Sequence, residues 1–145
     1  MVQPDEQAPP FAVPDHTGAE VRLADLRGTR VVLWFYPQAD TPGCTREACG
    51  FRDYHSGFQE KGAEVLGISF DPPAVNAAFR DAYALPYRLL SDTAREVARA
   101  YGAWDPDRPD APRRNTYVIG PEGTVEQVLE GVDPGAHPKA LFDAL

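Results

Sequence analysis

The side chains best suited to covalent chemistry are Cys44 and Cys49, the only two cysteines in this chain of 145 residues. A thiolate is the nucleophilic form of cysteine, and the first turn of a helix favours it. Thr41 and Pro42 precede Cys44 in the pattern of an N-cap and a first helical residue. Unpaired backbone N–H groups and the positive end of the helix dipole would then surround the Cys44 sulfur. The Thr41 hydroxyl would be placed to donate a hydrogen bond to the thiolate or to a substrate oxygen.

The spacing of the two cysteines limits how they can react with each other. On an ideal helix, residues five apart lie roughly 140° apart around the axis, with Cα atoms about 8–9 Å apart. A disulfide needs Cα atoms within about 7 Å. Cys44 and Cys49 therefore cannot bond while the helix is intact. Either they never pair, or pairing requires the first turns of the helix to unwind.

Other roles for Cys44 also have to be considered. A cysteine in a helix is often a small buried hydrophobe. Zinc binding would need a Cys/His cluster, and a thioredoxin-type dithiol would need Cys-x-x-Cys; the sequence has neither. A Cys–His hydrolase would need an imidazole, and nothing places His16, His55 or His137 beside Cys44. From the residues alone, Cys44 is either a nucleophile or a small buried hydrophobe. The three histidines are expected to be surface or packing residues.

These residues need a strand that ends just before them and a helix that begins at Thr41. Val31–Tyr36 is a continuous apolar, β-branched and aromatic run, which predicts a strand buried on both faces. An apolar stripe with spacings of three and four follows, and it predicts a helix that Gly62 ends. The stripe consists of Cys44, Ala48, Phe51, His55 and Phe58. Cys44 would then lie at the carboxyl end of a sheet, where open α/β sheets usually place their sites.

The rest of the chain also alternates strands and helices. The further predicted strands are Val21–Leu23, Glu64–Phe70, Tyr87–Leu90, Arg114–Ile119 and Thr124–Glu130. The further predicted helices lie between Asp71 and Pro86, between Asp92 and Gly102, and over Pro138–Leu145. The first of these is expected to bury Val75, Ala78, Phe79 and Ala82. This order predicts the α/β class, with a central mixed sheet flanked by helices on both faces, as a thioredoxin-like fold requires.

Length and charge limit the possible domain organisation and partners of the protein. A chain of this length suits one domain over residues 1–145, and we do not expect the Pro-rich loop Asp105–Pro112 to divide it. The 22 Asp and Glu against 14 Lys and Arg give a net charge of −8, which disfavours nucleic acid or an anionic membrane as a partner. No apolar run is long enough for a membrane span, and the acidic start is neither a signal nor a transit peptide. We therefore expect a cytoplasmic protein.

One long motif resembles a known family. The run Thr41-Pro-Gly-Cys44-Thr-Arg-Glu47-Ala-Cys49-Gly-Phe-Arg-Asp53, preceded by Phe35-Tyr36-Pro37, is similar to the signature of peroxiredoxin Q, also called bacterioferritin comigratory protein. Peroxiredoxins share the pattern Pro-x-x-x-Thr/Ser-x-x-Cys, which Pro37, Thr41 and Cys44 match here. The second cysteine five residues on is the mark of this subfamily. The resemblance covers most of the chain and includes Arg114-Asn-Thr116 before an apolar strand.

The resemblance implies a role for each matched residue. Cys44 would be the peroxidatic cysteine, which becomes a sulfenic acid when it reduces a peroxide. Arg114 would stabilise the thiolate and the charge on the leaving oxygen. Thr41 would hydrogen-bond the peroxide, and Pro37 would shield the sulfenic acid. Cys49 would be the resolving cysteine, which forms a Cys44–Cys49 disulfide after local unwinding.

The same resemblance implies a substrate and a reductant, and two alternative functions stand beside it. The substrate would be hydrogen peroxide or an organic hydroperoxide, and thioredoxin or a similar dithiol would reduce the disulfide. No metal or other cofactor is implied, because sulfur carries the chemistry, and members are often monomers. The chain departs from the family pattern at two places: Gln38 stands where the family often has lysine, and the acidic segment Trp104–Pro112 is short for the family. Glu47 matches the family pattern, but the resemblance assigns it no firm role. The alternatives are a general thiol–disulfide oxidoreductase and a redox-responsive binding or chaperone module.

Overall fold

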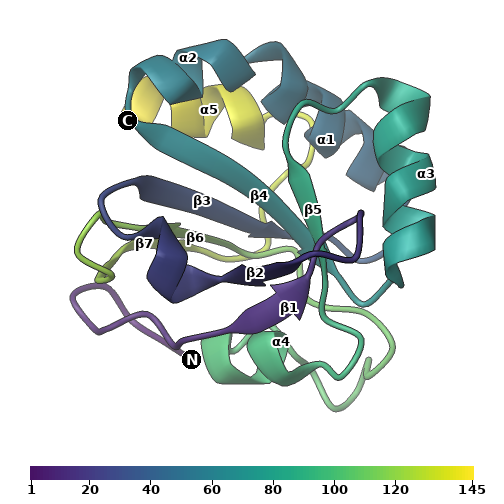
Figure 1. The fold of residues 1–145 in the computed structure, drawn as a ribbon, viewed down its shortest axis with the longest axis horizontal. Coiled ribbons are helices and arrows are strands. Elements are labelled where there is room, and N and C mark those ends of the chain that lie inside the picture. The colour runs from purple at the N-terminus through teal and green to yellow at the C-terminus, as the bar shows by residue number, and fades with distance from the viewer.

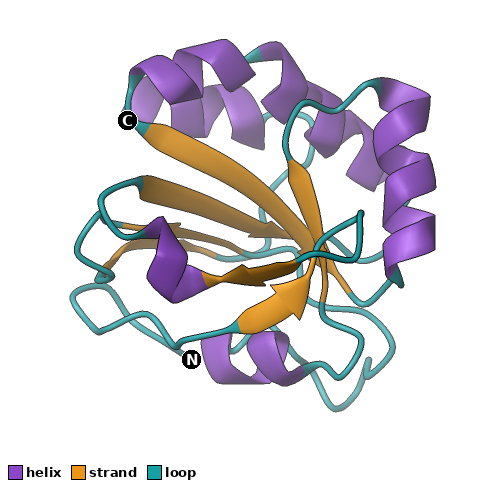
Figure 2. Cartoon of the chain, in the orientation of Figure 1, coloured by secondary structure: helices purple, strands orange, loops and turns teal.

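A mixed sheet of five strands forms the centre of the molecule, and the computed structural model describes all residues 1–145 (Figures 1 and 2). In chain order the elements are β1 (Ala12–Pro14), β2 (Glu20–Arg22), the 3₁₀ helix η1 (Leu23–Leu26), β3 (Arg30–Phe35), α1 (Pro42–Asp53), α2 (His55–Glu60), β4 (Ala63–Ser69), α3 (Pro73–Tyr83), β5 (Arg88–Ser91), α4 (Glu96–Tyr101), β6 (Thr116–Ile119), β7 (Val125–Leu129) and α5 (His137–Ala144). The strand order is β5-β4-β3-β6-β7. Strands β3, β4 and β5 are parallel, and β6 pairs antiparallel with both β3 and β7.

The central strand β3 contributes side chains to a hydrophobic core on each face of the sheet. Val31, Leu33 and Phe35 belong to one core, and Val32 and Trp34 belong to the other. This division follows from the two-residue period of a strand, in which successive side chains point to opposite faces. The prediction of a strand buried on both faces is confirmed.

Two layers cover the sheet. Helices α1, α2, α3 and α5 lie over one face, while α4, the β1–β2 hairpin and the N-terminal arm lie over the other (Figure 1). The predicted mixed sheet with helices on both faces is therefore confirmed. Strand β6 follows the Pro-rich loop and pairs with β3, so that Val31 lies opposite Ile119 and Trp34 opposite Thr116. None of the helices combines the length and hydrophobicity that crossing a bilayer requires.

The helix predicted to run as far as Gly62 is interrupted at Tyr54. The interruption lies where α5 packs against this part of the chain, and the Tyr54 and Phe142 rings are 5.1 Å apart. Two glycines allow the close approach: a Cβ atom at Gly50 would lie 2.7 Å from Pro138 Cγ, and one at Gly57 would overlap the Phe142 ring. The sequence-based prediction of one continuous helix was wrong because it took no account of α5.

The buried face of α3 also differs from the prediction. Asn76 and Phe79 are the buried residues, whereas Val75 is 42% exposed. The Asn76 amide nitrogen donates to the Leu90 carbonyl oxygen at 3.3 Å and to Ser91 Oγ at 3.1 Å, and Asn76 Oδ1 accepts from the Tyr36 hydroxyl at 2.6 Å. An unpaired amide in the core would be costly, so α3 is rotated to bury Asn76 with its three partners. The buried face is therefore not the apolar stripe that the sequence predicts.

Candidate active site

Cys44 lies in the first turn of α1 and is completely buried. The helix begins with Pro42, and Thr41 at the N-cap has an extended backbone with φ −92° and ψ 156°. A connection of six residues joins this helix to the end of β3. The structure thus places Cys44 where the sequence predicted, behind a buried strand and at a helix N-terminus.

The Thr41 hydroxyl does not bond to its own helix. It donates to the Gln38 carbonyl oxygen at 2.8 Å and closes the turn that leads into α1. The N-cap position was predicted correctly, but the capping hydrogen bond is absent. Because the single hydroxyl proton is already donated to Gln38, the oxygen of Thr41 has only lone pairs to offer a substrate.

Arg114 reaches Cys44 from the segment just before β6. Its Nη2 lies 3.6 Å from Cys44 Sγ, within hydrogen-bonding distance for sulfur, and its Nη1 donates to Glu47 Oε1 at 2.7 Å. The Arg114 side chain is 19% exposed, so its positive charge is held in a largely desolvated place. A cation in such a setting stabilises negative charge on the sulfur and on a developing oxyanion.

Gly43 makes room for this guanidinium. A Cβ atom at this position would lie 3.1 Å from Arg114 Nη2 and 3.6 Å from Pro134 Cγ. That is tighter than an ordinary van der Waals contact, so a larger residue would push Arg114 away from the helix start. The Thr-Pro-Gly-Cys run therefore needs glycine at position 43, because a side chain there would crowd Arg114.

Glu47 is the site residue to which sequence analysis assigned no role. It is completely buried, one turn along α1 from Cys44. Burial raises the pKa of the Glu47 carboxyl to about 7, against the hydrogen bond and the charge of Arg114, which both lower it. Its second oxygen, Oε2, has no hydrogen-bond partner. The sequence signal that could have indicated Glu47 is its position three residues after Cys44, since residues i and i+3 share a helix face.

Cys49 lies further along α1 and is only half-buried. Both cysteines are free thiols, and both belong to the same unbroken helix. The ideal-helix geometry that separates their Cα atoms by about 8–9 Å therefore applies. In this conformation the structure holds the two sulfurs apart.

Pro37 follows β3 and is half-buried in the connection that leads to α1. The same connection is anchored by a residue that sequence analysis missed: Asp71 Oδ2 accepts hydrogen bonds from the Ala39 backbone N–H and from Ser69 Oγ, both at 2.9 Å. Since Asp71 follows β4, it ties the loop before Cys44 to the neighbouring strand. No sequence signal indicated this link, because it joins residues 32 positions apart.

The histidines and possible metal ligands lie apart from Cys44. Arg114 is the only side chain that hydrogen-bonds the Cys44 sulfur. His137 is buried against the Thr116 hydroxyl at 2.9 Å, and the His55 ring packs against that of Tyr87. No three His, Cys, Asp or Glu side chains are grouped as metal ligands would be.

Fold and site together define a class of thiol enzyme, in which a thioredoxin-like sheet presents a cysteine at the start of a helix to a partly buried guanidinium. Residues 4–128 match the AhpC/TSA family, and the chain belongs to that family. A Mycobacterium tuberculosis protein named as a peroxiredoxin is 45% identical over 143 residues, which cover 95% of this chain and 91% of the relative. The chloroplastic peroxiredoxin Q of Gentiana triflora is 43% identical over 120 residues, covering 83% of this chain and 55% of the relative.

The solved structures agree with the sequence comparison. The crystal structure of the peroxidoxin BcpB from Mycobacterium tuberculosis superposes with a TM-score of 0.90 at 36% identity, covering 100% of this chain and 99% of that one. The predicted thioredoxin-like fold and the resemblance to peroxiredoxin Q are both confirmed. The protein is a thiol-dependent peroxidase of the peroxiredoxin class.

Proposed function

We propose that Cys44 is the peroxidatic cysteine and that Cys49 resolves it. The observation that carries the assignment is the placement of Arg114 Nη2 3.6 Å from Cys44 Sγ, at the N-terminus of α1. A partly buried cation and the N-terminus of a helix both stabilise negative charge on this sulfur. Cys49, which is half-buried and lacks a cationic hydrogen-bond partner, suits the second step.

The first step reduces a hydroperoxide. The Cys44 thiolate attacks one peroxide oxygen, an S–O bond forms and the O–O bond breaks. The leaving oxygen departs as an alkoxide or hydroxide and takes a proton from solvent, which gives an alcohol or water. Sulfur is oxidised to a sulfenic acid by two electrons. The Arg114 guanidinium stabilises the leaving oxygen as its negative charge develops.

Thr41 and Pro37 complete this site. The Thr41 hydroxyl donates its proton to Gln38, so the Thr41 oxygen is left to accept a hydrogen bond. It accepts this bond from the O–H group of the bound hydroperoxide and so orients the peroxide towards Cys44. Pro37, half-buried at the end of β3, limits the access of water to the sulfenic acid. Its ring has no N–H to compete for the substrate.

The second step forms a disulfide. The first turns of α1 unwind, the Cys49 thiolate attacks the Cys44 sulfenic sulfur, and an S–S bond forms as hydroxide leaves and is protonated to water. A thioredoxin-type dithiol then supplies two electrons by thiol–disulfide exchange and returns both cysteines to thiols. The separation of the two cysteines in the intact helix supports the unwinding step.

Serine variants test the two assignments. We expect Cys44→Ser to abolish peroxide-dependent oxidation of thioredoxin, and Cys49→Ser to react once with peroxide and then recycle poorly. Thr45→Ser, a change beside Cys44 that leaves both thiols, serves as the matched control. A non-reducing peptide map after one equivalent of hydrogen peroxide should contain a Cys44–Cys49 peptide pair. Normal turnover by Cys49→Ser would show that Cys49 is not the resolving residue.

The same assays separate the other roles considered for the two cysteines. A general thiol–disulfide oxidoreductase would reduce insulin without peroxide. A redox-responsive binding module would oxidise slowly and never turn over. Stopped-flow fluorescence of Trp34, which is buried in the same core as Cys44, follows the oxidation directly.

We further propose that the protein acts as a monomer in the cytoplasm, without nucleic acid or membrane partners. Met1 and Val75 are its only large exposed hydrophobic side chains, and its net charge of −8 repels polyanions. A reducing compartment also supplies the dithiol that the cycle consumes. Light scattering should give the monomer mass before and after oxidation, and a dimer mass in either state would contradict the proposal.

A further inference from the structure

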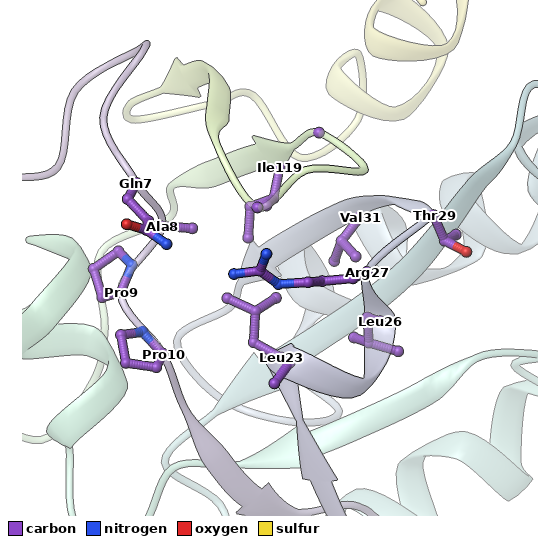
Figure 3. A pocket seen from close by; sticks show the side chains of 13 residues that line it. Gln7, Ala8, Pro9, Pro10, Leu23, Leu26, Arg27, Thr29, Val31 and Ile119 are labelled. Atoms are coloured by element: carbon purple, nitrogen blue, oxygen red, sulfur yellow. The ribbon is translucent and has the colours of Figure 1, made fainter.

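A pocket lined by residues of the N-terminal arm lies away from Cys44, and we call it the arm cavity (Figure 3). It has a volume of about 400 Å³, and its lining comes from residues 7–10 of the N-terminal arm, from η1, from the start of β3 and from the turn between β6 and β7. Val31 lies at the beginning of β3, whereas Cys44 follows the end of that strand. The arm cavity and the peroxidase site therefore occupy opposite ends of the sheet.

The floor of the arm cavity is apolar. Val31 and Ile119, which are opposite each other on paired strands, are each 1% exposed, and Leu23 and Ala8 complete the floor as members of the same core. Pockets of about 300–1,000 Å³ with apolar linings are typical of small-molecule sites. A hydrocarbon body seated here would extend the hydrophobic core.

The walls of the arm cavity are formed in advance. The Ala8 N–H donates to the Gly123 carbonyl oxygen at 2.9 Å, which ties the arm to the β6–β7 turn. The Gly28 N–H donates to the Pro121 carbonyl oxygen at 2.9 Å, which ties the segment that follows η1 to the same turn. Consecutive prolines at Pro9 and Pro10 stiffen the arm between these points. A ligand would therefore lose little affinity to ordering of the site.

One unpaired cation lies across the arm cavity. In Figure 3 the Arg27 side chain extends from the end of η1 between Leu23 and Ile119 towards the arm. Its side chain forms no hydrogen bond, ion pair or aromatic contact, although acidic residues outnumber basic ones in the chain. The carboxylate beside Gly120 belongs to Glu126, which is paired with Arg30 at 2.7 Å. The Arg27 guanidinium is thus free to bind an external anion.

We propose that the arm cavity binds a small organic carboxylate with a linear apolar body, about the size of a medium-chain fatty acid. The apolar floor takes the hydrocarbon body, and the planar guanidinium of Arg27 takes the carboxylate through two parallel N–H···O bonds. A single cation matches a single negative charge, which favours a monocarboxylate over a phosphate. Nothing in the peroxide chemistry at Cys44 depends on this site.

Three linear probes of eight carbons each test the proposal: octanoate, octan-1-ol and octylamine. Amide chemical shifts of the ¹⁵N-labelled protein should change on titration with octanoate at Ala24, Thr29, Gly120 and Gly123, and should stay constant at Cys44. Octanol should bind more weakly at the same place, and octylamine should bind least because of Arg27. Absence of shifts at these residues up to millimolar octanoate would overturn the proposal.

Two variants separate the charge from the cavity. Arg27→Gln should weaken octanoate binding about tenfold and leave octanol binding unchanged, since a charge-assisted hydrogen bond is lost. Arg22→Gln, an exposed arginine outside the cavity, is the matched control. Ala24→Trp fills the mouth and should abolish binding of both probes. Equal octanoate affinity in Arg27→Gln and wild type would refute the role of Arg27, and both variants should retain wild-type peroxidase activity.

Discussion

Cys44, Arg114 and Glu47 form a row of three groups in which the central cation contacts both neighbours, at 3.6 Å to the sulfur and 2.7 Å to the carboxylate. The Glu47 carboxyl orients the guanidinium, and the guanidinium stabilises the ionised form of Glu47 against the larger effect of burial. Removing one member of a buried pair leaves the other uncompensated, so the row behaves as a unit. We therefore expect Glu47 to act on Cys44 through Arg114, as a positioning residue.

Glu47 should make stability depend on pH. Burial raises the Glu47 pKa from 4.5 to about 7 in the folded state, so the protonated form is favoured by folding. Its contribution to stability is therefore complete below the unfolded pKa and declines as pH rises from 4.5 to about 7. Wild type should lose on the order of 1–3 kcal/mol relative to Glu47→Gln across this window. Urea unfolding of both proteins at several pH values measures the difference, and a pH-independent difference would contradict the expectation.

Gly43 should control the position of Arg114. In Gly43→Ala the new Cβ would lie 3.1 Å from Nη2 and displace the guanidinium from the sulfur. We expect a reaction with peroxide that is roughly tenfold slower or more, because small misplacements of catalytic groups have large effects on rate. Helix propensity should keep the free energy of unfolding at or above that of wild type. Ser56→Ala, an exposed change in α2, is the control, and an unchanged peroxide rate in Gly43→Ala would refute the steric argument.

Helix α1 is held in place by the chain segment 83–87 between α3 and β5. The Tyr87 hydroxyl donates to the Ala48 carbonyl oxygen at 2.7 Å in a buried position, and Arg52 Nη1 donates to the Tyr83 carbonyl oxygen at 2.9 Å. The Tyr83 hydroxyl reaches Asp40, just before the helix, at 2.6 Å. Cys49 lies between the two anchored points of α1, so unwinding that brings it to Cys44 must break at least some of these bonds.

The Tyr87 hydroxyl should therefore slow disulfide formation. In Tyr87→Phe the ring still packs beside Trp34, but the hydrogen bond to α1 is lost. We expect resolution of the sulfenic acid to become about fivefold to tenfold faster, with an unchanged first step. Stopped-flow fluorescence separates the two phases. Tyr117→Phe removes a buried hydroxyl on the opposite face of the sheet and should leave both phases unchanged. An unaltered second phase in Tyr87→Phe would contradict this role.

At the scale of the whole molecule, one sheet separates two cores of similar size, and β3 contributes to both. The proposed peroxidase site belongs to the core under α1, and the arm cavity opens onto the other core. Because β6 joins the sheet beside β3, segments from both ends of the chain depend on the same strand. A change that disrupts β3 should therefore affect both sites.

Residues 1–145 should unfold as one domain. The shared strand couples the two cores, so we expect a single cooperative urea transition in which far-UV circular dichroism and tryptophan fluorescence coincide. Trp34 reports the core under α1, and Trp104 packs against the other. Non-coincident transitions would indicate that the chain contains more than one folding unit.

Features that depend on near neighbours could be predicted from the sequence. The apolar run of β3, the Thr-Pro start of α1 and the Asp92 carboxylate that accepts the first N–H groups of α4 all follow from local patterns. Recognition of the cysteine motif also needed only contiguous residues. These signals suffice because strand alternation and helix capping act over a few positions.

Features that join distant segments of the chain could not be predicted in this way. Packing of α5 onto Gly50 and Gly57 interrupts the first helix, and the partners of Asn76 turn α3. Glu47 became a member of the site only when Arg114 returned from 67 positions away to pair with it. Each of these outcomes depends on a contact between residues far apart in the sequence. Such a contact forms only when the chain folds, so no local sequence pattern could predict it.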